Sequence, residues 1–107
     1  MADKEQALLR IEVGTARPPT SKCREVIAVL EAAVRQFPGR VRLLVYERGA
    51  PWSEPPTEGF LQAAKFGQVP MIVIGGKLKA LGKVLDQETL VNVIREALPR
   101  TGGSSAI

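Results

Sequence analysis

The stretch Gly14–Arg24 constrains the fold more than any other, because it joins a short apolar run to a long amphipathic one. Residues 7–13 alternate at their end between apolar and charged side chains, which is typical of a strand with one buried face. The proline pair at 18–19 favours an extended loop, and Thr20 or Ser21 can cap a helix behind it. The stretch therefore predicts a strand that ends at Gly14, a loop, and the start of a helix.

The next two segments extend this pattern into a βαβ unit. Apolar residues recur at spacings of three and four between residues 26 and 37, as in a helix that packs on a core, and Pro38-Gly39 ends the pattern. Residues 41–46 are apolar almost throughout, which indicates a central strand covered on both faces. Two strands joined through a helix are expected to be parallel.

The second half of the chain predicts a proline-rich loop, a short helix, a hairpin and a last helix. The predicted ranges are a loop at 49–59, a helix at 60–66, a strand at 69–74, a Gly75-Gly76 turn, an edge strand at 77–81 and a helix from Asp86 to Pro99. The order β-α-β-(α)-β-β-α predicts an α/β fold, in which a mixed four-stranded sheet has helices on both faces.

The composition is that of a single small globular domain. The chain has 107 residues, and we expect one domain over 1–99 and a disordered Gly/Ser-rich tail at 100–107. There is no apolar run long enough to span a membrane and no signal-peptide pattern near the first residue, so we expect a cytoplasmic protein without a membrane partner. The net charge is +4, but the basic residues are interspersed with acids, so we expect no specific nucleic-acid partner.

Cys23 is the only cysteine, and the chain has no histidine. An intramolecular disulfide and a Cys-His or Ser-His pair are therefore excluded, and we expect neither a metal site nor a bound cofactor. Cys23 would lie in the first turn of a helix, where the helix dipole and the adjacent Lys22 and Arg24 favour the thiolate. The alternative is an inert, buried cysteine that packs as a small apolar residue. We expect a monomer, and an intermolecular disulfide through Cys23 is the other possibility.

Three features together resemble the thioredoxin fold over residues 7–98. They are Gly14-Thr15 ahead of the helix that holds Cys23, Val69-Pro70 at the start of the third strand, and the hairpin 74–77 followed by Gly82. The resemblance is closest to small single-domain thioredoxin-like and glutaredoxin-like proteins. It implies a cis Val69–Pro70 bond that packs beside the active-site cysteine position.

The chain departs from the Cys-x-x-Cys motif of that family, because Thr20 stands in the first position and Cys23 in the second. The resemblance implies that Cys23 and Thr20 are the catalytic residues, with the Thr20 hydroxyl bound to the thiolate. It also implies that the groove residues bind the substrate, which is a protein thiol or disulfide or glutathione. These groove residues are Val69, Pro70, Pro19 and Lys22.

Two functions follow from these observations. The first is a monothiol redox role, in which Cys23 takes part in thiol-disulfide exchange or forms a mixed disulfide. The alternative is a non-catalytic binding module that has lost its dithiol and binds a protein partner in the groove beside Pro70. The Thr-x-x-Cys spacing also resembles the peroxiredoxin motif, although Ala16 stands where that motif has proline. Trp52 in the proline-rich loop is interpreted as a packing residue, with partner binding as the other interpretation.

Overall fold

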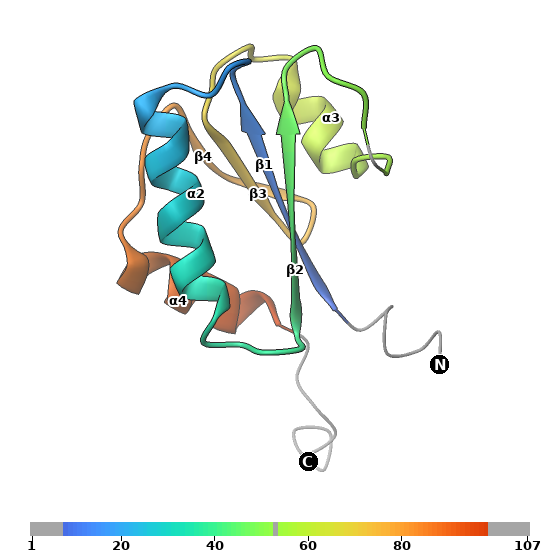
Figure 1. Cartoon of the computed structure of the whole chain (residues 1–107). Coiled ribbons are helices and arrows are strands. Elements are labelled where there is room, and N and C mark those ends of the chain that lie inside the picture. Colours follow the sequence, from blue (N-terminus) through green and yellow to red (C-terminus); the bar gives the residue numbers. More distant parts are fainter. Residues whose placement is uncertain (1–7, 53, 99–107) are drawn as a thin grey trace.

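The computed structural model describes residues 8–52 and 54–98, so the predicted tail at 100–107 lies outside the described residues. Strands and helices follow one another along the chain in the predicted order (Figure 1). The elements are β1 (Leu9–Thr15), α2 (Ser21–Val34), β2 (Val41–Glu47), α3 (Glu58–Ala64), β3 (Met71–Ile74), β4 (Lys77–Leu81) and α4 (Gln87–Ala97).

The four strands form one mixed sheet in the order β2-β1-β3-β4. β1 pairs in parallel with β2 and antiparallel with β3, and β3 pairs antiparallel with β4. The parallel pair is joined through α2, as the βαβ pattern predicted. The predicted α/β fold with a mixed four-stranded sheet is therefore confirmed.

The helices cover both faces of the sheet, and each face has its own core. α2 and α4 lie on one face, and α3 lies on the other (Figure 1). Ile11, Val13 and Ile72 are fully buried against the first pair of helices. Phe60 of α3 packs with Tyr46 and other side chains of the opposite face. This division follows from strand geometry, because successive side chains point to opposite faces.

Two predictions about the strands are wrong. β2 is an edge strand, and its Arg42 and Val45 are exposed. Its apolar run arises because Leu43 packs on one core and Leu44 on the other, although the outer edge has no neighbouring strand. β1 does not end at Gly14 but continues to Thr15, because Gly14 pairs with both neighbouring strands and Thr15 still pairs with Glu47 of β2. β4, by contrast, lies at the other edge with its lysines exposed, as predicted.

A buried carboxylate holds the proline-rich loop on the α3 face of the sheet. Glu12 in the middle of β1 has no exposed area, and its carboxylate accepts hydrogen bonds from the Thr57 hydroxyl and from the Thr57 backbone N–H at 2.7 Å. Arg10 Nε lies 3.4 Å from the same carboxylate. Thr57 is also the N-cap of α3, so this contact fixes where that helix begins.

The ion pairs continue from Arg10 to the surface. Arg10 donates a hydrogen bond of 2.8 Å to the Tyr46 hydroxyl and lies 3.1 Å from the Glu54 carboxylate. Glu54 in turn pairs with Arg42 of the edge strand. The network therefore links the two strands β1 and β2 to the loop that covers them.

We predict that Glu12→Ala destabilises the fold by about 3 kcal/mol, because the Thr57 amide and hydroxyl lose their acceptor and Arg10 loses its contact with a fully buried carboxylate. Urea unfolding monitored by circular dichroism measures this free energy. Glu58→Ala, at an exposed position of α3, is the matched control and should change stability by less than about 0.5 kcal/mol. Equal effects of the two substitutions would contradict a structural role for the Glu12 carboxylate.

Gly59 allows α3 to approach the β3–β4 turn at backbone distance. A Cβ added at Gly59 would lie 1.8 Å from the carbonyl oxygen of Gly76. Helix propensity alone predicts that Gly59→Ala stabilises the protein by about 0.5–1 kcal/mol. We predict the opposite sign, a clear loss in the free energy of unfolding, because the helix must move away from the turn. A stabilised variant in the urea titration would rule out this contact.

Candidate functional site

Thr20 and Cys23 lie together at the N-terminus of α2. Thr20 has extended backbone angles and caps the helix, and its side-chain oxygen accepts a hydrogen bond of 3.1 Å from the Cys23 backbone N–H. The same hydroxyl donates to Cys23 Sγ at 3.2 Å. One threonine side chain therefore fixes both the start of the helix and the position of the sulfur.

The thiol is enclosed although its neighbours are exposed. Cys23 has 0% exposed area, whereas Thr20, Lys22 and Arg24 are all exposed. The helix turn directs Cys23 inward, as expected for the residue three positions before the buried Val26. The first position of the motif is thus on the surface, and the second is beneath it.

The surroundings of the sulfur favour its ionised form. Burial raises the pKa of the Cys23 thiol, but the Thr20 hydroxyl and the backbone N–H groups of Ala16 and Thr20 lower it, and Arg24 adds a smaller electrostatic contribution. The net effect is a pKa below the ordinary value of a cysteine. Hydrogen bonds from several donors therefore outweigh the cost of enclosing the charge.

Two hydrogen bonds link the Val69-Pro70 segment to this turn of the helix. The Val69–Pro70 bond is cis, and so is the bond between Arg17 and Pro18. The Gly82 backbone N–H donates to the Pro70 carbonyl at 2.7 Å, and Lys22 Nζ donates to the Gly82 carbonyl at 3.4 Å. Lys22 therefore connects the start of α2 to the loop that supports Pro70.

The substrate-binding residues predicted from the sequence differ in their accessibility. Pro70 is buried, while Val69 and Pro19 are half-buried and Lys22 is exposed. The Pro19 carbonyl accepts a hydrogen bond of 2.8 Å from Arg24. Within the described part of the chain, no hydrogen bond is formed by the Val69 backbone. Among residues 8–52 and 54–98, the Val69 amide and carbonyl thus have no hydrogen-bond partner.

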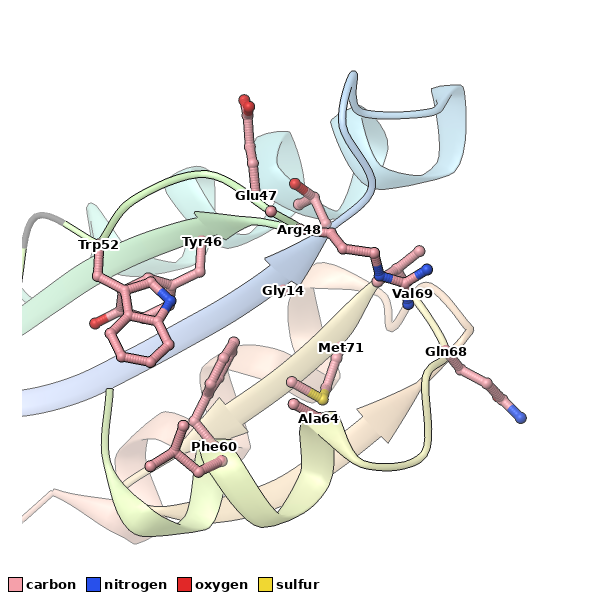
Figure 2. A pocket seen from close by; sticks show the side chains of 13 residues that line it. Gly14, Tyr46, Glu47, Arg48, Trp52, Phe60, Ala64, Gln68, Val69 and Met71 are labelled. Atoms are coloured by element: carbon pink, nitrogen blue, oxygen red, sulfur yellow. The ribbon is translucent and has the colours of Figure 1, made fainter. Parts of the chain in front are cut away.

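Sequence reasoning missed a cavity that adjoins this site on the α3 face (Figure 2). Its volume is about 170 Å³, and its walls are mainly apolar and aromatic. Thr15 and Val69 line it at the end nearest the site. Its other lining residues include Gly14, Tyr46, Arg48, Trp52, Phe60, Leu61, Ala64 and Met71.

Trp52 was the only sequence signal for this cavity, and the favoured interpretation as a packing residue does not describe its position well. The indole is 54% exposed and lies at the wall of the cavity. The other walls come from β1, β2, α3 and β3, so only the tertiary fold brings them together.

Residues 8–52 and 54–98 contain no group of three or more histidine, cysteine or acidic side chains that could hold a metal ion. No helix there has the length and apolar character needed to cross a membrane.

Comparison with known proteins identifies the fold. No protein-family model matches the sequence, and no curated protein is detectably similar to it. Among solved structures, the germline-specific thioredoxin Deadhead from Drosophila melanogaster is 13% identical, with a TM-score of 0.53 over 89% of this chain and 86% of that one. Oxidised thioredoxin O2 from Arabidopsis thaliana is 18% identical, with a TM-score of 0.55 over 89% of this chain and 79% of that one. The chain therefore has a thioredoxin-like fold.

Proposed function

We propose that this protein is a thioredoxin-fold binding module, which holds an extended segment of a partner protein in the groove beside Pro70. The observation that carries the proposal is the placement of Thr20 and Cys23. The exposed first position of the motif holds a hydroxyl, and the only sulfur lies enclosed behind it. A partner that reaches this surface meets Thr20 rather than a thiolate.

Val69 supplies the means of holding an extended chain. Val69 is half-buried, and its backbone forms no hydrogen bond within the described part of the chain. An extended partner segment can pair with such a free amide and carbonyl as an additional strand would, so main-chain hydrogen bonds supply affinity and side-chain pockets supply specificity. Val69 thus gives the groove a main-chain docking point.

The charge around the groove favours an acidic partner. Arg17, Lys22 and Arg24 are exposed at this end of the molecule, and the chain as a whole has a net charge of +4. Complementary charge raises association rates and disfavours basic partners. We therefore assign an acidic segment to the groove.

A second candidate function, the monothiol redox role, is favoured by the lowered pKa of Cys23. In that role the Cys23 thiolate attacks a disulfide of glutathione or of a protein, a mixed disulfide forms, and the other sulfur leaves as a thiolate. When the mixed disulfide joins Cys23 to a protein, a glutathione thiolate then attacks the protein's sulfur, a protein–glutathione disulfide forms, and Cys23 leaves as the thiolate. Because the sulfur is enclosed, the first turn of α2 would have to open before the attack.

The rate of Cys23 alkylation by iodoacetamide, measured against pH in the folded protein, separates the two functions. For a binding module, we expect slow modification through transient opening and complete modification once the chain is unfolded in urea. Rapid modification of the folded protein would instead support the redox role and overturn the binding assignment, if the rate has its inflection at a pH below about 8.5, the ordinary pKa of a cysteine. Cys23→Ser, incubated with oxidised glutathione, is the control that must form no mixed disulfide.

We also predict that Thr20→Val raises the pKa of Cys23, whereas Thr20→Ser leaves it near the wild-type value because the hydroxyl is kept. The ultraviolet absorbance of the thiolate measures this pKa without requiring reagent access. An unchanged pKa in Thr20→Val would contradict the role of the hydroxyl bond.

The same shift has a consequence for stability. The pKa of Cys23 is lower in the folded chain than in the unfolded chain. Ionisation of Cys23 therefore stabilises the fold at pH values above the unfolded-state pKa, which is about 8.5. This contribution is lost as the pH falls through the folded pKa. The stability difference between wild type and Cys23→Ser should therefore grow with rising pH in urea titrations. A difference that is independent of pH would argue against the lowered pKa.

A further inference from the structure

We propose that the cavity between β2 and α3 takes one aromatic side chain of the partner's acidic segment. This inference rests on the proposed binding function and adds the residue that the partner presents. The cavity opens beside Val69, where that segment would pair, and its walls are shared by the sheet, α3 and the loop that holds Trp52 (Figure 2).

The volume of the cavity is suited to a single aromatic ring. Its volume is about 170 Å³. An apolar cavity of about 150 Å³ is sufficient to bind benzene, whereas sites for drug-sized molecules begin near 300 Å³. One phenyl-sized side chain therefore fits, and a large cofactor does not.

The walls have the chemistry that an aromatic ring prefers. Tyr46 and Phe60 form an aromatic pair with ring centroids 4.9 Å apart and planes inclined by 54°. Figure 2 shows the Trp52 ring, Phe60 and the Met71 thioether turned toward the same space, while Gln68 points away from it. Aromatic pairs and sulfur–aromatic contacts each add stabilisation beyond simple burial.

The cavity is continuous with the groove. Val69 and Thr15 line its end nearest the Cys23 turn, so both sites share these residues. In an extended segment, successive side chains point to opposite sides. A segment that pairs with the Val69 backbone therefore directs one side chain toward the α3 face, where the cavity lies.

The rim of the cavity combines one cation with exposed apolar surface. Arg48 lines the cavity and donates a hydrogen bond of 2.7 Å to the Gly67 carbonyl, which holds the guanidinium near the mouth. Leu61 of α3 lines the cavity and is exposed. Glu47 also lines the cavity, but Figure 2 shows its carboxylate pointing away from the space that Trp52 and Phe60 face. The guanidinium of Arg48 beside apolar surface therefore fits a ring flanked by carboxylates.

The experiment uses a capped pentapeptide with a central phenylalanine and glutamate at the other positions. Trp52 is the only tryptophan, so its fluorescence reports on the cavity wall directly. A methionine methyl label gives a second signal from Met71. We expect saturable changes in both signals, and binding weaker by at least about tenfold when alanine replaces phenylalanine.

Two substitutions test the site within the protein, each with a matched control. Ala64→Phe should fill the cavity from an exposed position of α3 and weaken binding by at least about tenfold, whereas Ala28→Phe on the exposed side of α2 should not. Arg48→Gln should weaken binding by about two- to fivefold and reduce its salt dependence. Arg40→Gln, at the opposite end of β2, should leave binding unchanged. Circular dichroism confirms that each variant is folded.

The outcomes separate this inference from the binding function on which it rests. If both peptides shift the amide signals of Val69 and leave Trp52 and Met71 unchanged, the groove binds a partner but the cavity assignment is overturned. If neither peptide binds at millimolar concentration, the cavity assignment is also overturned, and the alkylation profile of Cys23 decides the binding function separately. A Trp52 change that depends only on protein concentration would mean that a second copy of the chain occupies the cavity, which again overturns the proposal.

Discussion

The pairing of β1 on both of its edges is the constraint on which the rest of the structure depends. β1 lies between β2 and β3, so it carries side chains into both cores at once. Its odd-numbered residues Ile11 and Val13 support α2 and α4, while Glu12 on the other face anchors the loop that leads to α3. Because pairing continues to Thr15, the strand also delivers the Ala16 amide to the sulfur of Cys23.

The fold was largely predictable because its local signals agree with one another. The alternation before Gly14, the cap at Thr20, the glycine hairpin and the cap at Asp86 each specify one element. Strand order was not predictable in the same way, because the periodicity of β2 reports which faces are buried and not whether a neighbouring strand is present. An edge strand between two cores has the same apolar run as a central one. The end of β1 was misplaced because Gly14 was interpreted as the end of the strand. In the structure, its missing side chain makes room for Met71 and Phe60.

The candidate site was predictable only where its residues are close in sequence. Thr20 and Cys23 lie one helical turn apart, so their contact follows from helix geometry. The enclosure of the sulfur did not follow, because it depends on how α2 is rotated against the sheet. The cavity could not be found at all, since its walls come from segments far apart in the chain. The pKa of a thiol and its accessibility are therefore separate properties, and a sequence motif indicates mainly the pKa.

Two consecutive residues of β1 connect the Cys23 turn to the cavity on the α3 face. Thr15 is the last residue before the loop that reaches Cys23, and Gly14 lines the cavity on the α3 face. A Cβ at Gly14 would lie 3.2 Å from the Met71 methyl and 3.3 Å from the Phe60 ring, so a larger side chain there would occupy the space that now forms the cavity. The open cavity thus depends on the absence of a side chain at one position of the central strand. The same end of β1 that contributes to the surroundings of Cys23 therefore also leaves the cavity open, so the binding surface that we propose does not depend on a reachable thiol.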